Sequence, residues 1–166
     1  ATAYFERASQ LAPKHQEVLV EWAKMDMVAG DYKGMKEKSE KCFVLDPDLR
    51  DCYWIRALSK IYVKDFIGAK EDIAIVYSEG FGSHATFPLH QLVVAYATTK
   101  NYKELVVVYE KLIQMRPDIP EYHSSLAFTY AKMAEYKKAR EEALIFLQLM
   151  PEAKDEVNAF LQTLPY

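Results

Sequence analysis

Residues 134–151 read AEYKKAREEALIFLQLMP, a polar turn and an aromatic residue followed by an amphipathic run that ends at a proline. Pro117 precedes that last proline by one period of about 34 residues, and Pro13 precedes Pro47 by the same interval. Two such periods and two additional residues separate Pro47 from Pro117. A fixed period of this length is typical of stacked, nearly identical supersecondary units.

Each period also contains a short polar turn, about fifteen residues before the stop, that is followed by an aromatic residue. The four copies are Gly30-Asp31-Tyr32, Lys64-Asp65-Phe66, Lys100-Asn101-Tyr102 and Ala134-Glu135-Tyr136. Apolar residues recur at i, i+3, i+4 and i+7 upstream of the turn, and a second amphipathic stretch follows it. The proline ends this second helix because its ring and its missing N–H cannot continue the hydrogen-bond ladder. Each period therefore predicts a helix, a turn and a second helix.

The small residue in the first helix (Ala23, Ala57 and Ala127), the aromatic after the turn and the closing proline resemble the tetratricopeptide repeat. The resemblance covers essentially the whole chain and implies an all-α fold, a right-handed α-solenoid of antiparallel helix hairpins. The predicted single domain is a half-repeat at 1–13 (a second helix), repeats at 16–49, 50–85, 86–119 and 120–153, and a capping helix at 154–166.

The second repeat departs from the pattern, because Arg56 and Lys60 stand at positions that ought to be apolar. Shifting this helix by one residue places four apolar side chains on one face: Trp54, Ala57, Leu58 and Ile61. The alternative is a half-buried pair in which Asp26 of the preceding repeat faces Arg56 or Lys60. The second repeat also has Phe81 in the proline position, between two glycines, which predicts the longest and loosest connection.

Composition argues for one non-membrane domain. Of 166 residues, 51% are apolar and 27% charged, and the net charge of −3 comes with scattered basic residues, so no footprint for nucleic acid or anionic lipid is expected. No apolar run approaches the ~20 residues of a membrane span, and no signal-peptide pattern is present. Cys42 and Cys52 could pair if consecutive helices pack, but reduced core thiols are the favoured interpretation, and with them a cytoplasmic location. The start at Ala1 suggests a segment of something longer.

No catalytic, cofactor or metal site is predicted. The four histidines (His15, His84, His90 and His123) lack the spacing of metal ligands. A glycine-rich phosphate loop, a Gly-x-Ser-x-Gly turn and a Cys/His nucleophile arrangement are all absent from the sequence. The chain is therefore expected not to be an enzyme.

The resemblance implies that the first helices of the repeats line a groove that binds a partner protein or peptide. Carried over residue by residue, the groove positions are Val20, Lys24, Trp54, Leu58, Tyr62, His90, Val94, Ser124 and Phe128. The shifted register would instead place Trp54 in the core, so its assignment stays open. The lysine and asparagine clamp of repeats that grip carboxyl termini is missing, which favours a helix or an extended apolar peptide as the partner.

The expected function is that of a non-catalytic interaction scaffold. The alternative is that the chain is the soluble tail of a larger bacterial protein, for example a membrane-embedded polysaccharide polymerase or ligase, whose activity lies outside this segment. The half-repeats at the two ends also allow end-to-end self-association, in which Tyr4 and Phe5 of one copy would meet the helix at 154–166 of the next.

Overall fold

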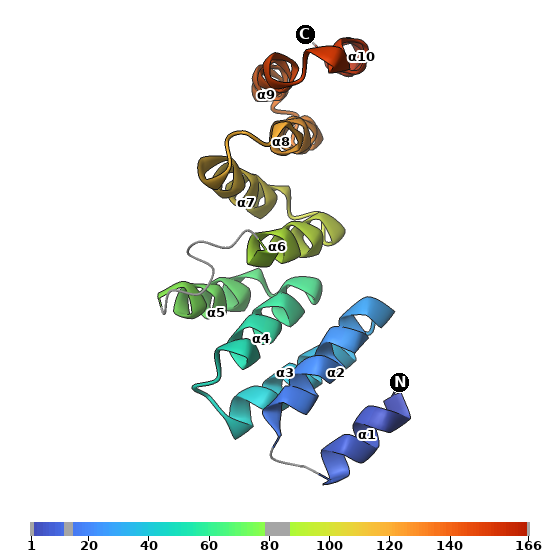
Figure 1. The fold of residues 1–166 in the computed structure, drawn as a ribbon, viewed down its shortest axis with the longest axis vertical. Coiled ribbons are helices and arrows are strands. Elements are labelled where there is room, and N and C mark those ends of the chain that lie inside the picture. Colours follow the sequence, from blue (N-terminus) through green and yellow to red (C-terminus); the bar gives the residue numbers. More distant parts are fainter. Residues whose placement is uncertain (1, 12–14, 79–86, 166) are drawn as a thin grey trace. The chain divides into compact units, whose positions relative to one another are not determined.

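The computed structural model describes residues 2–11, 15–78 and 87–165, and these residues are almost entirely helical (Figure 1). The helices in these ranges are α1 (Thr2–Leu11), α2 (Gln16–Ala29), α3 (Tyr32–Leu45), α4 (Arg50–Tyr62), α5 (Phe66–Ser78), α6 (Phe87–Thr98), α7 (Tyr102–Met115), α8 (Pro120–Lys132), α9 (Tyr136–Leu149), the short 3-10 helix η1 (Pro151–Ala153) and α10 (Lys154–Thr163).

The chain forms two compact units, Ala1–Ser83 and His84–Tyr166, called here the first and the second unit. In the first unit α2 packs against α3 and α4 against α5, and α3 joins the two hairpins by packing on α4. In the second unit the successive contacts are α6 with α7, α7 with α8, α8 with α9 and α9 with α10. Each predicted repeat therefore contains a pair of helices, while the repeat boundaries themselves stay a prediction.

The four polar turns share one backbone conformation. Gly30, Lys64, Lys100 and Ala134 all have a positive φ, between 58° and 77°. In each turn the next residue donates its N–H to the carbonyl five residues back, as Asp31 does to Asp26 at 2.9 Å and Glu135 to Tyr130 at 3.0 Å. This is the Schellman ending of a helix, in which a left-handed residue lets two N–H groups cap the last carbonyls. The four turns predicted from the sequence are therefore the places where the first helix of each hairpin is capped and ends.

Aspartate begins the second helix in the first two hairpins. Asp31 Oδ1 accepts a hydrogen bond from Gly34 N at 2.9 Å, and Asp65 Oδ1 accepts one from Gly68 N at 3.1 Å. Such N-caps satisfy one of the free N–H groups of a first helical turn. A Cβ atom at either glycine would collide with the capping carboxylate, which explains glycine at a helical position.

The last helix covers the end of the second unit. Val157 and Leu164 are buried against α8 and α9, and Arg140 of α9 donates to the carbonyls of Leu161 and Leu164 at 3.3 and 2.8 Å. The exposed side chains of α10 are mostly polar, among them Asp155, Asn158 and Gln162. The looser connection predicted around Phe81 lies outside the described residues.

Candidate functional site

Three of the nine predicted groove residues belong to the core. Val20, Trp54 and Leu58 are buried, with 3%, 7% and 1% of their surfaces exposed, so none of them is available to a partner. Their groove assignment is corrected for this reason. In α4 the shifted register holds, because Trp54, Ala57, Leu58 and Ile61 are all buried. The sequence left the assignment of Trp54 open between core and groove. The structure places Trp54 in the core.

The other predicted groove residues of the first unit are partly exposed and already have neighbours. Lys24 Nζ lies 2.6 Å from Glu21 Oε1 on the same helix, α2. The ring of Tyr62 stacks on that of Tyr32, with 4.3 Å between centroids and 3° between planes. Burial, and secondarily the proximity of Tyr32, raises the pKa of the Tyr62 phenol. Both side chains can contact a partner only at their remaining exposed surface.

The second unit leaves its predicted positions more open. His90 is exposed and its Nε2 lies 3.1 Å from Tyr122 Oη, a hydrogen bond that links α6 to α8. Val94 is 56% exposed and Phe128 is 50% exposed, while Ser124 is half-buried. Val94 and Phe128 are two of several large apolar side chains of this unit that are exposed, with Val107, Leu144 and Leu149.

Phe128 lies between two hollows. Its ring meets that of Phe160 of α10, with centroids 4.7 Å apart. On the α10 side is a shallow, mainly apolar hollow with room for about one water molecule, lined by Ser124, Ala127, Phe128, Ala143, Phe146, Glu156, Val157 and Phe160. On the α7 side is a wider and more open one of about 250 Å³, lined by Tyr102, Tyr109, Ser125, Phe128, Thr129 and Lys132. The two hollows and the Phe128 ring that borders both form one surface. We call it the Phe128 groove.

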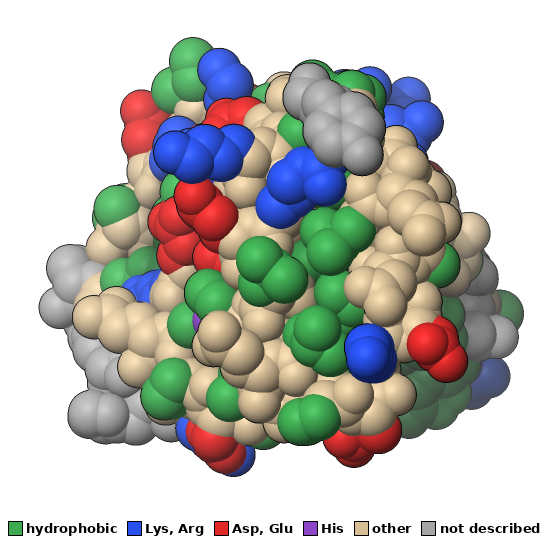
Figure 2. Space-filling view, turned by 90° about the horizontal axis from the view of Figure 1, so that it is seen from above, with side chains coloured by type: hydrophobic (Ala, Val, Ile, Leu, Met, Phe, Trp, Pro, Cys, Tyr) green, Lys and Arg blue, Asp and Glu red, His purple; other side chains and the backbone are tan. Residues whose placement is uncertain are grey.

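Figure 2 views the molecule from above Figure 1, toward the C-terminal helices. Apolar side chains gather in the middle of this face, and lysine, arginine, aspartate and glutamate side chains lie among them and around them. Neither sign of charge forms a continuous field on this face.

Polar side chains link the two helices of three hairpins, a pattern that was not predicted from the sequence. Lys38, Asp72 and Glu142 are equivalent positions in α3, α5 and α9, since their spacing matches that of the prolines. Lys38 pairs with Asp26 at 2.5 Å, and Glu142 Oε2 lies 2.7 Å from His123 Nδ1. The signal that could have revealed this was the charge recurring on the period, with Val108 as the apolar exception.

The buried charges of the first unit differ from the predicted pair. Asp72 is almost fully buried and receives both Arg56 Nη2, at 2.6 Å, and Lys60 Nζ, at 2.9 Å. The Arg56 guanidinium also lies over the ring of Phe43, 3.5 Å from its centroid. The proposed pairing of Asp26 with Arg56 or Lys60 is therefore wrong, because each charge finds a partner inside its own hairpin. A buried charge needs such a partner to offset its lost hydration.

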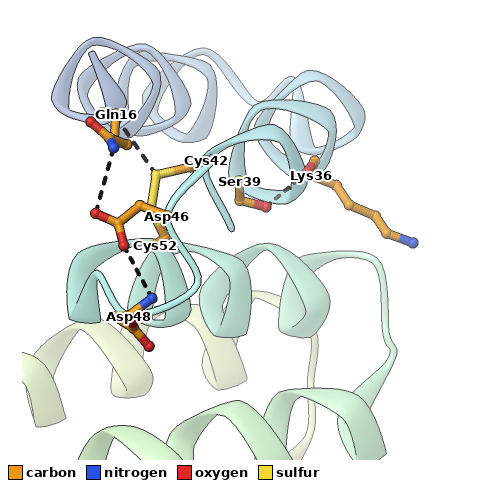
Figure 3. The surroundings of a disulfide bond; sticks show 7 residues. All are labelled: Gln16, Lys36, Ser39, Cys42, Asp46, Asp48 and Cys52. Atoms are coloured by element: carbon orange, nitrogen blue, oxygen red, sulfur yellow. Dashed lines mark hydrogen bonds between the residues drawn. A yellow bond between two sulfur atoms is a disulfide. The ribbon is translucent and has the colours of Figure 1, made fainter. Parts of the chain in front are cut away.

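The two cysteines correct another expectation. Cys42 of α3 and Cys52 of α4 form a disulfide with their Cα atoms 5.5 Å apart (Figure 3). The favoured interpretation as reduced thiols is wrong, because the α3–α4 packing brings the two residues together across the turn at Pro47. Figure 3 shows the polar residues around this junction, where Gln16 of α2 reaches Asp46 and Asp46 accepts the N–H of Asp48.

Tyr130 of the second unit is a titratable group with a strongly shifted pKa. Its hydroxyl donates to Glu110 Oε1 at 3.1 Å, and Lys138 Nζ lies 5.1 Å from its ring centroid. Burial first, and then the hydrogen bond to Glu110, raises the pKa of the Tyr130 phenol to about 12. The hydrogen bond from Tyr130 to Glu110 ties α7 to α8.

Among the described residues, no group of three His, Cys, Asp or Glu side chains could hold a metal ion. The same part of the chain contains no helix with the length and apolar character that a membrane crossing requires.

The chain matches no protein-family model, and no curated protein sequence matches it. Solved structures do match. MamA from Desulfovibrio magneticus RS-1 superposes with a TM-score of 0.68 at 17% identity, over 90% of this chain and 84% of that one. YrrB, described as a TPR protein with an unusual peptide-binding site, gives 0.64 at 15% identity, over 95% and 80%. At these identities the likeness shows the fold alone. It confirms the predicted fold class, an all-α solenoid of the tetratricopeptide-repeat type.

Proposed function

We propose that the chain is a non-catalytic scaffold that binds a peptide or helix of a partner protein, and that the Phe128 groove is its main contact surface. The observation that carries this is the half-exposed Phe128 ring with a hollow on each side. Aromatic side chains that fill or border apolar pockets supply much of the binding energy in protein interfaces. The fold supports the proposal, and the description of YrrB as peptide-binding is in keeping with it.

The residues proposed to contact the partner are those of the predicted set that remain accessible. In the second unit they are His90, Val94, Ser124 and Phe128, and in the first unit Lys24 and Tyr62. The first unit provides less apolar surface at these positions, because Val20, Trp54 and Leu58 are buried. The second unit is therefore the principal site.

The proposal can be tested by selecting binders from a displayed library of random twelve-residue peptides on the folded chain. We expect enriched peptides to lose about tenfold or more in affinity for Phe128→Ala. The matched control is Leu144→Ala, which removes a similarly exposed side chain from α9 and should leave binding unchanged. If no peptide is enriched, or if none depends on Phe128, the proposed groove is wrong.

End-to-end self-association is a second proposal that one observation favours. Tyr4 is 74% exposed and, with Phe5 and Ala8, borders a hollow on α1 and α2. The polar exposed face of α10 offers this surface little to pack against, which makes self-association the weaker of the two proposals. Sedimentation at rising concentration checks it, since a mass that stays monomeric would remove it.

The compartment is proposed from the disulfide rather than from the absence of a targeting pattern. Disulfides persist in oxidising environments and are rare in reducing ones. The Cys42–Cys52 bridge therefore favours an oxidising compartment over the cytoplasmic location expected from the sequence. Membership of a larger bacterial protein stays a prediction, which the parent reading frame would test.

A further inference from the structure

The two hollows of the Phe128 groove carry opposite charges. Glu156 lines the hollow on the α10 side, and Lys132 lines the hollow on the α7 side. Each hollow has one side chain that carries a full charge at neutral pH. Both of these side chains are exposed. Neither has an ion-pair or hydrogen-bond partner within the described part of the chain. Some other exposed charges of this unit are paired, such as Lys138 with Glu135 at 2.6 Å.

The remaining lining of the two hollows also differs. Ala127, Phe146, Val157 and the ring of Phe160 make the α10 side almost wholly apolar. On the α7 side Tyr102 and Tyr109 present phenol rings, and the Thr129 hydroxyl already donates to the Ser125 carbonyl at 2.8 Å. Both walls have more apolar than polar surface and so suit apolar side chains, with a shallow hollow on the α10 side and a wider one on the α7 side.

We propose that the Phe128 groove selects a peptide segment of defined charge order. Two apolar side chains of the segment lie on either side of the Phe128 ring. A basic residue lies beside the one near α10, facing Glu156, and an acidic residue lies beside the one near α7, facing Lys132. The inference rests on the proposed function and adds the chemistry of the partner to it. Charges at the rim of an interface act mainly on the choice of partner, because like charges repel the wrong one.

A purely structural role for the two charges makes a different prediction. Glu156 lies in the first turn of α10 and Lys132 in the last turn of α8, where each charge has the sign that favours its helix end. If this were their only role, reversing them would lower the stability of the helices and leave the choice of ligand unchanged. A measurement of selectivity therefore separates the two roles.

The test uses three synthetic, fluorescently labelled peptides that share a central segment of two leucines around one serine. One has lysines on one flank and glutamates on the other, one has lysines on both flanks, and one has glutamates on both. We expect the mixed peptide to bind the native chain about threefold more tightly than either uniform peptide, the factor typical of an exposed ion pair. Fluorescence anisotropy measures the three affinities.

Charge reversal gives the decisive comparison. Glu156→Lys should shift the preference to the peptide with glutamates on both flanks, and Lys132→Glu to the peptide with lysines on both. The double reversal should transfer the preference to a fourth peptide, the mixed one with its two flanks exchanged, which net charge cannot explain because it then equals that of the native chain. Lys137→Glu on α9 is the matched control, since it changes the net charge outside the groove and should leave the ranking as it was.

The outcomes distinguish this inference from the proposed function. If the displayed library yields peptides that depend on Phe128 but the three synthetic peptides bind equally or not at all, the charge order is wrong and the scaffold function stands. The charge order is equally wrong if the ranking survives charge reversal. If no displayed peptide depends on Phe128, both proposals fail. Thermal melting of each variant verifies that it is folded.

Discussion

The hairpins α4–α5 and α8–α9 have the same topology and lie two repeats apart in the chain. They differ in exposure at equivalent positions, which are buried in the first hairpin and accessible in the second. Asp72 and Glu142 occupy equivalent positions, but Asp72 binds two cations and Glu142 binds one imidazole. The two cations stand where α8 has Leu126 and Tyr130. Putting charge at core positions therefore required a different set of side chains to provide the apolar face of α4.

The consequence appears at the next equivalent pair. Trp54 and Leu58 are buried in α4, whereas their equivalents two repeats later, Ser124 and Phe128, face the groove of the second unit. The same two repeat positions thus serve as core in one hairpin and as surface in the other. The position of a residue in the repeat does not determine whether it is exposed. The rotation of each helix about its axis also depends on which side chains of the neighbouring helices it packs against.

The largest expected difference is between Trp54→Ala and Phe128→Ala. We expect Trp54→Ala to lower the free energy of unfolding by about 4 kcal/mol, because it leaves a cavity in a packed core. Phe128→Ala should cost about 1 kcal/mol, since half of its surface is already in water. Urea denaturation followed by circular dichroism, with amide hydrogen exchange to locate the loss, measures both. Equal costs would contradict the contrast between the two hairpins.

The second difference is between the two acids. Asp72→Asn should cost about 3 kcal/mol, because Arg56 and Lys60 would remain largely buried without a counter-charge. Glu142→Gln should cost about 1 kcal/mol, since a neutral His123 can still hydrogen-bond to the amide. Replacing the cluster by apolar residues, with Arg56→Leu, Lys60→Met and Asp72→Leu together, should recover most of the loss. A triple variant less stable than Asp72→Asn would show that the charges are needed for more than mutual compensation.

The third comparison is between the junctions at the two prolines. Cys42 occupies in α3 the place of the buried Leu112 in α7, so one junction is covalent and the other is held by packing and a hydrogen bond from Tyr130 to Glu110. Reducing the disulfide should lower the unfolding free energy of the first unit by about 2.5 kcal/mol, given its separation of 10 residues. Hydrogen exchange with and without dithiothreitol measures this. The second unit is the internal control and should not respond.

Much of the fold was predictable from local signals. The turn followed by an aromatic and the closing proline predicted the helix pairs, because each of these signals acts on the few residues around it. The proline period then indicated that the pairs repeat. The register of α4 was also predictable, since only one rotation buries Trp54, Ala57 and Ile61 together. The site was predicted less well. Equivalent positions in the repeats indicated which residues could line the groove. Three of these residues, Val20, Trp54 and Leu58, are buried in the structure and cannot contact a partner.

The partners of the charged side chains could not be predicted, for a physical reason. Asp26, Arg56 and Lys60 each had several acceptable partners within reach along the chain, and the pairing depends on distances across a hairpin that the period does not specify. The disulfide is a similar case. Whether Cys42 and Cys52 form a disulfide depends on how closely α3 packs on α4, which the sequence does not specify.

The sequence by itself determined the helices, their ends and their pairing, because propensity, capping and apolar periodicity operate over a few residues. Only the tertiary structure decided which side chains reach water, which charges pair and that Phe128 stands between two hollows bearing Glu156 and Lys132. These features depend on contacts between helices, where a rotation of one residue exchanges core for surface. The function proposed for this chain depends on that second kind of information.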